Sequence, residues 1–169
     1  MGKNMAAVAK FGLKPGHRSS IRRVEGGMLS YHADVDVKTN PHELGLERLV
    51  NLDIAADFIG KMALTRIRDI GVTRKQVGLR IYAPPLTGPN TTFWPVMNRA
   101  ETICKVTSAV YSPRLKHNIA LAMVSIDYAK IGVGCGIQTA AEFVQATVVE
   151  KPIFDPKKNY INALARYFT

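Results

Sequence analysis

The chain has 169 residues, of which 47% are hydrophobic, and its 23 Lys and Arg residues outnumber its 13 Asp and Glu residues to give a net charge of +10. This length fits one ordinary domain or two small ones, and this composition favours a packed core over a disordered chain. The longest apolar runs, such as residues 119–124, are too short to cross a bilayer, and Lys3 is followed by only a modest apolar stretch. We therefore expect a cytoplasmic protein with no membrane partner.

The positive charge favours anionic partners, which include anionic cofactors, carboxylate substrates, nucleic acid and acidic protein surfaces. The basic residues are dispersed in small groups such as Arg22-Arg23 and Lys157-Lys158, and no tract holds five or more of them. The single Trp94 has no basic neighbour, and no aromatic-basic signature of an RNA-recognition motif occurs. We therefore expect no nucleic-acid partner.

Metal and disulfide chemistry have little support in the sequence. The two cysteines, Cys104 and Cys135, form no C-x-x-C motif, and the four histidines show no ligand spacing. Both thiols are expected to be small buried hydrophobes. We predict neither a metal site nor a disulfide.

The amino-terminal segment combines a helix signal with extended patterns. Residues 4–11 are expected to form the last turns of a helix that Gly12 closes in a left-handed conformation. Residues 21–25 have the apolar pattern of a strand and run into Gly26-Gly27, after which residues 28–31 return to an extended pattern.

Two helices are predicted next. Asn40-Pro41-His42-Glu43 is a helix start, because Asn is a good cap, Pro suits the first helical position and Glu follows three residues after the cap. The helix that it opens is expected to be short. A second helix is expected to begin with Asp57 as its cap and to end at Gly71, with apolar residues at helical spacing in between: Met62, Ala63, Ile67 and Ile70.

After Arg74 the pattern changes to short strand-like runs separated by turn residues. These runs cover residues 77–82, 103–110, 120–126 and 144–149. Many short strands with regular turns predict a small antiparallel β-barrel or a sandwich. The glycine-rich residues 132–136 lack the following helix that a dinucleotide-binding loop requires, so they are interpreted as a barrel turn.

The fold class is therefore predicted as α+β, with a boundary near residue 76. Residues 1–76 are expected to be part of an α+β domain, and residues 77–169 a small antiparallel β-barrel. The tail from residue 155 to residue 169 is basic and aromatic and is expected to wrap back or fray.

No motif taken singly identifies an enzyme. Ser108 and Ser112 lie near His117 in the sequence but lack the G-x-S-x-G elbow of a hydrolase. Glu25 is more informative, because the two glycines after it leave room for a flat heterocycle such as a pterin to donate two parallel N–H groups to its carboxylate. The alternative is a salt bridge from Glu25 to a neighbouring arginine, Arg22 or Arg23, of the weak kind common at surfaces.

Several segments resemble, in the same order, the motifs of the glycine-cleavage T-protein family. Residues 23–31 resemble the family's R-L-E-A-G-x-x-x-Y strand, and residues 40–46 resemble its P-x-E-x-G-L turn. Further resemblances are to D-F-I-G-x-x-A-L at 57–64, R-x-x-V-G-L at 74–79, V-T-S-G-x-x-S-P-x-L-x-x-N-I-A at 106–120 and P-F-Y at 151–154. The ordered set covers nearly the whole chain, which is identified as a carboxy-terminal half. Its local details are closer to the dimethylsulfoniopropionate demethylase branch.

The resemblance implies a tetrahydrofolate-dependent methyl- or aminomethyl-transferring enzyme. In this family, tetrahydrofolate lies in the mouth of a three-part ring, and its N5 atom receives a one-carbon unit from a methylated amine or sulfonium substrate. Glu25 matches the carboxylate that anchors the pterin. Arg74 matches a basic residue that faces folate or substrate carboxylates, and Tyr31, the tyrosine of the first motif, is assigned to the same cofactor site. No catalytic residue is assigned.

The departures from the family qualify this assignment. The amino-terminal half, which carries an acidic residue near the transfer centre, is missing, so the chain is expected to need that half in cis or in trans and to be inactive alone. A second basic binding residue of the family falls on Asp53 or Ile54, which argues against the ordinary aminomethyl substrate. The competing hypothesis is a non-catalytic basic β-module that binds an anionic polymer or a protein partner.

Overall fold

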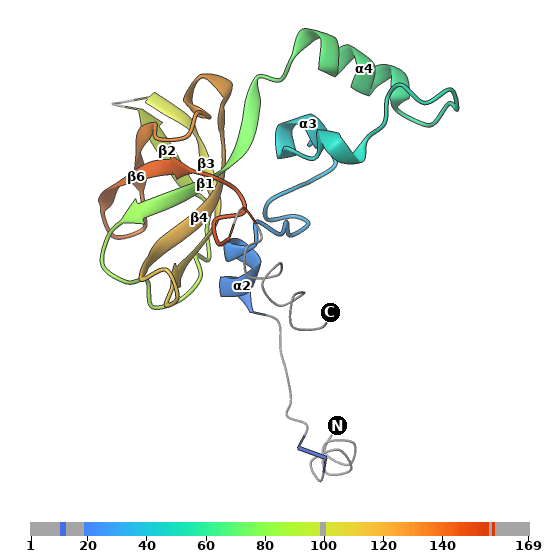
Figure 1. Cartoon of the computed structure of the whole chain (residues 1–169). Coiled ribbons are helices and arrows are strands. Elements are labelled where there is room, and N and C mark those ends of the chain that lie inside the picture. Colours follow the sequence, from blue (N-terminus) through green and yellow to red (C-terminus); the bar gives the residue numbers. More distant parts are fainter. Residues whose placement is uncertain (1–10, 13–18, 99–100, 156, 158–169) are drawn as a thin grey trace.

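The computed structural model describes residues 11–12, 19–98, 101–155 and 157. The helix predicted over residues 4–11 and most of the predicted tail over residues 155–169 lie outside the described residues. The described chain consists of a six-stranded barrel with a few short helices before it (Figure 1). No helix among the described residues is long and apolar enough to span a membrane.

The barrel is closed and antiparallel, in the strand order β1-β4-β3-β2-β5-β6. Its strands are β1 (Arg74–Tyr82), β2 (Trp94–Asn98), β3 (Glu101–Ser112), β4 (His117–Ser125), β5 (Gly134–Gln138) and β6 (Phe143–Val149). The small antiparallel barrel predicted from the sequence is therefore confirmed. Each strand of the closed sheet is paired with two neighbouring strands.

Strand alternation fills the inside of the barrel. Val77, Leu79 and Ile81 of β1 point into a core cluster that includes Ala120 and Ala122 of β4. On β4 the residues that alternate with these alanines, Ile119 and Leu121, are also fully buried, but in a second cluster with Val24 and Val110. Strand β4 is therefore covered on both faces, from inside by the barrel core and from outside by the segment around Val24.

The segment around Val24 is a helix, so the strand predicted over residues 21–25 is wrong. Helix α2 (Ser20–Glu25) is capped by Ser19, whose side chain accepts a hydrogen bond from the Arg22 amide. Ile21 and Val24, three residues apart, lie on one face and pack against the barrel. The residues after it, expected to be extended, form turns and a single bridge between Tyr31 and Val35.

The predicted start of the next helix is confirmed. Helix α3 (Pro41–Leu44) has a reciprocal capping box, in which the Asn40 side chain accepts from the Glu43 amide and the Glu43 carboxylate accepts from the Asn40 amide. Gly45 ends the helix with a φ of 71°, and the short 3-10 helix η1 (Glu47–Leu49) follows.

The longest described helix, α4 (Lys61–Ile70), ends before Gly71 as predicted but begins after Gly60 instead of being capped by Asp57. The Asp57 carboxylate, three residues before Gly60, accepts a hydrogen bond from the amide of the next residue, Phe58, and bonds to no amide of the helix. Figure 1 shows α4 projecting away from the barrel, and none of its residues is buried.

A second 3-10 helix, η2 (Ile126–Tyr128), lies between the barrel strands β4 and β5.

Candidate functional site

Glu25, the predicted pterin anchor, is the last residue of α2, and its side chain is 5% exposed. Its Oε1 atom accepts a hydrogen bond of 2.5 Å from the Ser112 hydroxyl at the end of β3, and its Oε2 atom lies 4.0 Å from the Arg114 guanidinium. Its backbone carbonyl accepts from the amides of Ile153 and Phe154, both at 2.9 Å. Glu25 therefore joins α2 to two parts of the barrel domain, and its ion pair is with Arg114 instead of the neighbouring arginines.

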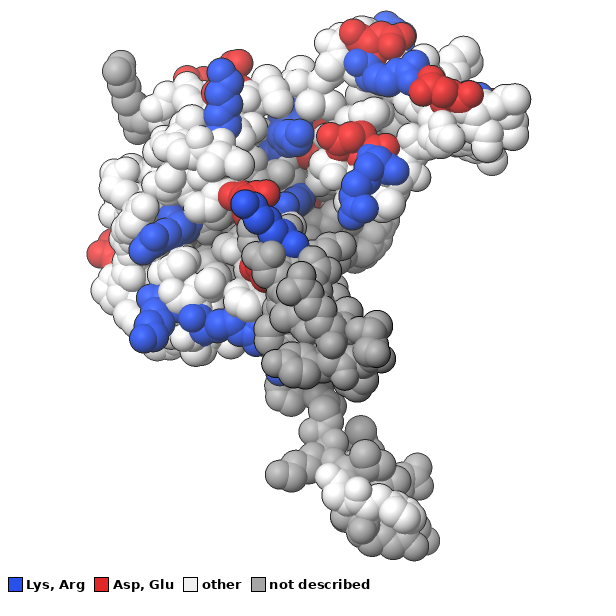
Figure 2. All heavy atoms as spheres, in the orientation of Figure 1, with Lys and Arg blue, Asp and Glu red and all other residues white. Residues whose placement is uncertain are grey.

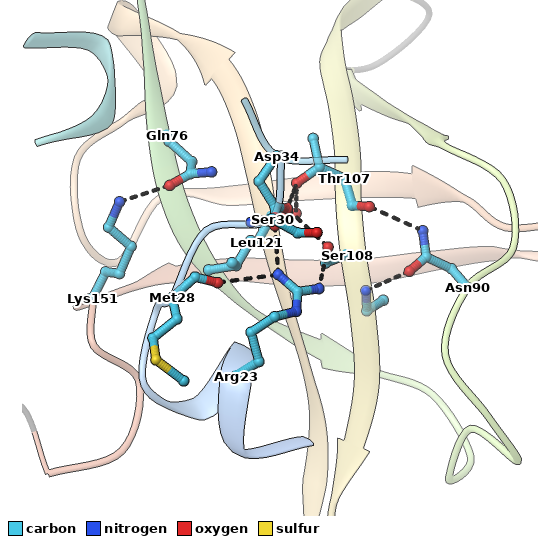
Figure 3. A network of polar contacts seen from close by, with 11 residues as sticks. Arg23, Met28, Ser30, Asp34, Gln76, Asn90, Thr107, Ser108, Leu121 and Lys151 are labelled. Carbon is cyan, nitrogen blue, oxygen red and sulfur yellow. Dashed lines mark hydrogen bonds and ion pairs between the residues drawn. The ribbon is translucent and has the colours of Figure 1, made fainter. Parts of the chain in front are cut away.

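A buried network around Asp34, which sequence reasoning missed, holds the loop after α2 against the barrel (Figure 3). The Asp34 side chain is fully buried and forms an ion pair with Arg23 of α2. It also accepts hydrogen bonds from the Ser30 amide at 2.9 Å and from the hydroxyls of Thr107 and Ser108 on β3. One carboxylate thus joins three segments: α2, the loop over residues 28–34 and β3.

Arg23 completes this network. Its guanidinium donates to the Ser108 hydroxyl at 2.7 Å and to the Met28 carbonyl at 3.1 Å, in addition to its ion pair with Asp34. The planar, forked guanidinium suits this arrangement because several donors are held in one plane. The loop that carries Tyr31 is therefore fixed at both of its ends.

Tyr31 lies in this loop and is 57% exposed. Its ring meets the ring of His32 edge to face, with the centroids 4.4 Å apart. His32 has a φ of 70°, a left-handed conformation that is uncommon for a residue with a side chain. Both residues line a hollow of about 590 Å³ whose opposite wall is formed by residues 90–93.

Arg74 begins β1 and faces a second, much smaller hollow of about 40 Å³. Its guanidinium pairs with both oxygens of the Glu43 carboxylate, at 2.8 and 3.3 Å, and donates to the Lys38 carbonyl. The same hollow is lined by Lys105 and Asp36. A hydrogen bond from Thr39 lowers the pKa of the Asp36 carboxyl, so this group is ionised at neutral pH.

The structure brings two of the three predicted cofactor residues together. The hollow at Tyr31 and the hollow at Arg74 share His32, Ala33 and Thr107 as lining residues, so they are neighbours on one side of the molecule. Glu25 lines neither hollow, because its carboxylate is directed at Ser112. Of the three residues that the sequence assigned to one cofactor site, Tyr31 and Arg74 therefore lie at neighbouring hollows and Glu25 lies apart from both hollows.

Two further features bear on the chemistry of the site. Lys105 lies over the Phe93 ring, 4.3 Å from its centroid, which places a cation between the two hollows. Of the two positions where the family's second basic residue was expected, Asp53 forms an exposed ion pair with Arg68 at 3.0 Å, and Ile54 is 47% exposed. Among the described residues, no group of three or more His, Cys, Asp or Glu side chains is placed to hold a metal ion.

The charged side chains on the face drawn in Figure 2 do not gather in one patch. On the face drawn in Figure 2, lysine and arginine side chains are spread over the barrel and over the segments before it, with acidic side chains between them. This arrangement differs from the continuous basic stripe that follows a nucleic-acid backbone.

The comparisons with known proteins agree with one another. Residues 74–155 match the glycine cleavage T-protein C-terminal barrel domain. The chain is 36% identical over 147 residues to the aminomethyltransferase of Synechococcus sp. (strain CC9902) and 37% identical over 147 residues to that of Synechococcus sp. (strain RCC307). Each match covers 87% of this chain and 39% of the relative, so the chain spans about two fifths of the length of these relatives.

The fold is also similar to that of a solved structure, the glycine cleavage system aminomethyltransferase T from Bartonella henselae. The TM-score is 0.73 at 21% identity, over 81% of this chain and 38% of the other. Residues 74–155 are therefore similar to the C-terminal barrel domain of glycine cleavage T-proteins, and most of the chain is similar in sequence to a part of these aminomethyltransferases.

Proposed function

We propose that this chain is the folate-side part of a tetrahydrofolate-dependent one-carbon transferase that works in the cytoplasm. In this proposal, residues 1–76 belong to the folate-binding domain, and residues 77–169 form the barrel domain with its basic tail. The observation that carries the proposal is the placement of Tyr31 and Arg74 beside neighbouring hollows, Tyr31 on a loop that the buried Asp34 network fixes to the barrel and Arg74 at the start of the barrel strand β1. Such fixed segments suit a site that acts by positioning its ligand.

The residues around the hollows fit the parts of a folate. The exposed ring of Tyr31 and the ring of Phe93 offer apolar faces to a flat aromatic group. Arg74 and Lys105 offer positive charge to carboxylates. Glu43 holds the Arg74 guanidinium in place, and the Arg74 side chain is still 39% exposed. A ligand carboxylate could therefore reach Arg74 while the ion pair with Glu43 remains.

The role of Glu25 as the pterin anchor is proposed from the family resemblance. Its buried carboxylate can accept two parallel N–H donors only if Oε1 gives up its hydrogen bond from Ser112 or shares it. The Oε2 atom of Glu25 has a weaker contact, because the guanidinium of Arg114 lies 4.0 Å away and the Arg114 side chain is 52% exposed. Movement of Arg114 would open this oxygen to a ligand.

Tetrahydrofolate supplies the nucleophilic N5 atom that accepts the one-carbon unit. The protein contributes positioning, so no residue of this chain is proposed to be catalytic. The acidic residue expected near the transfer centre would come from an amino-terminal part, present in cis or in trans. The donor is proposed to be a small methylated amine or a sulfonium, and Asp53 or Ile54 in place of a basic residue argues against the ordinary aminomethyl substrate.

Turnover tests this proposal. The chain should be assayed alone and co-expressed with the amino-terminal part of the Synechococcus sp. (strain CC9902) aminomethyltransferase, with tetrahydrofolate and either dimethylsulfoniopropionate or the glycine-cleavage intermediate. We expect transfer only when both parts and tetrahydrofolate are present. Demethylation by the chain alone would contradict the proposal. Salt-sensitive RNA binding with no effect of folate would favour the competing hypothesis of a non-catalytic basic module.

A further inference from the structure

The segment around α4 exposes apolar side chains that nothing in the described structure covers. We name residues 53–70 the α4 arm. Ile59 is 104% exposed, Met62 is 87% exposed and Ile70 is 74% exposed. On a helix, Ala63, Ile67 and Ile70 lie on one side, with Met62 at the edge of that side. Lys61 and Arg68 lie on the opposite side, and Arg66 and Asp69 flank Met62. The apolar side of α4 therefore faces solvent.

The arm is held together mainly by its own contacts. The Lys61 ammonium donates to the carbonyls of Ile54 and Ala56, and Arg68 pairs with Asp53. These bonds tie the loop before α4 to the helix itself. No other described helix or strand packs extensively against α4.

A helix of this length needs a packing partner. Isolated helices shorter than about 12–15 residues are marginal in water, and most helical stability in proteins comes from packing of the apolar side. Helix α4 has 10 residues and buries none of them. Met62 and Ile70 also line a hollow of about 700 Å³, together with Thr65 and the charged residues Asp57, Lys61, Arg66 and Asp69. Protein interfaces combine buried apolar side chains with polar ones around them, and both kinds of residue are present here.

The comparisons identify what could occupy this surface. The match to the Synechococcus sp. (strain CC9902) relative spans 147 of the 169 residues, so it includes α4 whichever end is left out. The barrel match begins only at residue 74, after the arm. The sequence of the arm thus lies within the stretch similar to this aminomethyltransferase but outside the barrel match, and 61% of that relative lies beyond the matched stretch.

We propose that the apolar side of the α4 arm is the docking surface for the amino-terminal part of a full-length aminomethyltransferase-like protein. The inference rests on the proposed function only for the identity of this partner. Because the matched barrel is the C-terminal domain of those proteins, most of the unmatched part of such a relative precedes the barrel. Docking covers Ile59, Met62 and Ile70 and stabilises α4 as it forms the interface.

Co-purification tests the surface directly. The tagged chain is co-expressed with the amino-terminal part of the Synechococcus sp. (strain CC9902) aminomethyltransferase, so that the two parts can fold together. The double variant Met62→Glu/Ile70→Glu should reduce the recovered complex at least about tenfold, because two charges would have to be buried. Glu is a good helix former, so α4 itself should tolerate both changes. The matched control is Ile131→Glu, at a barrel position of similar exposure (69%), which should leave recovery unchanged.

Hydrogen exchange supplies the second measurement. The α4 amides should exchange with little protection in the chain alone and should gain at least about tenfold protection in the complex. Strong protection in the monomeric chain, no complex with the unmodified chain, or equal recovery of the double variant would each overturn the proposal. A dimer of this chain that the double variant dissociates would assign the surface to a second copy, and would also overturn it. None of these measurements uses folate, so failure of docking and failure of the proposed function are separable.

Discussion

The barrel and the α4 arm differ in what their apolar side chains contact. In the barrel, residues such as Leu79, Val96 and Ile137 have no exposed surface, and each strand is paired on both sides. In the arm, Met62 and Ile70 are largely exposed. In the barrel, the strands bury one another's apolar side chains. In the arm, the apolar side chains of α4 have no such partner among the described residues. Apolar patterning alone therefore does not tell which elements are stable by themselves.

The largest difference between the barrel and the arm is expected in the free energy of unfolding when an apolar side chain is truncated. Leu79→Ala should lower the free energy of unfolding by about 2–5 kcal/mol, because it removes a fully buried side chain and leaves a cavity in the barrel. Met62→Ala should change it by less than about 0.5 kcal/mol. Urea denaturation followed by circular dichroism measures both. Similar losses for the two variants would show that α4 already packs within the chain.

Ion pairs provide the next comparison, between the buried network and the arm. Asp34→Ala should destabilise the chain by about 3 kcal/mol, because it leaves Arg23 and two hydroxyls without their buried acceptor. Asp53→Ala, which removes the acceptor of an exposed pair with Arg68, should cost less than about 1 kcal/mol. Denaturant titrations of both variants check the difference. A small effect of Asp34→Ala would mean that the loop carrying Tyr31 is not fixed by this network.

The pH dependence of stability should reveal the dry interior of the barrel. Burial raises the pKa of the Cys135 thiol from 9.0 to about 11. Between these values the unfolded chain loses this proton while the folded chain keeps it, so stability falls as the pH rises. Between pH 8 and pH 10.5 under reducing conditions, the parent chain should lose about 1–2 kcal/mol more than Cys135→Ala, at about 1.4 kcal/mol per pH unit above 9. Equal losses would place the thiol in contact with water.

Much of the barrel could be predicted from the sequence because its strands carry local signals. Four of the six strands were expected from apolar runs between turn residues. The other two were missed for local reasons: Pro95 interrupts β2, and β5 begins with Gly134 and contains Gly136. A Cβ at Gly136 would lie 2.0 Å from the Phe143 ring, so glycine is needed there for strand contact although it weakens the strand pattern.

The candidate site was harder to predict, because its contacts join residues far apart in the sequence. Asp34 bonds to Thr107 and Ser108, which lie 73 and 74 positions away. No local pattern marks such a residue. Helix α2 was mistaken for a strand because six residues are too few for a clear period, and only the Ser19 cap marked it as a helix. The boundary near residue 76 and the cofactor roles of Glu25, Tyr31 and Arg74 stay predictions.

The smallest expected effect concerns the most specific claim, that this chain supplies the carboxylate that anchors a pterin. Glu25→Gln keeps the shape of the side chain, and its amide oxygen can still accept the Ser112 hydrogen bond. The amide nitrogen, however, puts a donor where the pterin edge requires an acceptor. The fold should survive, which the midpoint of urea unfolding checks.

The direct measurement is calorimetric titration of folinic acid into the co-expressed complex that contains the parent chain, Glu25→Gln or the control Glu47→Gln. Glu47 is a half-exposed carboxylate whose nearest basic group, on Lys75, is 3.9 Å away. Glu25→Gln should weaken folinic acid binding at least about tenfold, or about 1.4 kcal/mol, and Glu47→Gln should leave it unchanged. Equal affinities for all three proteins would contradict the claim that Glu25 anchors the pterin.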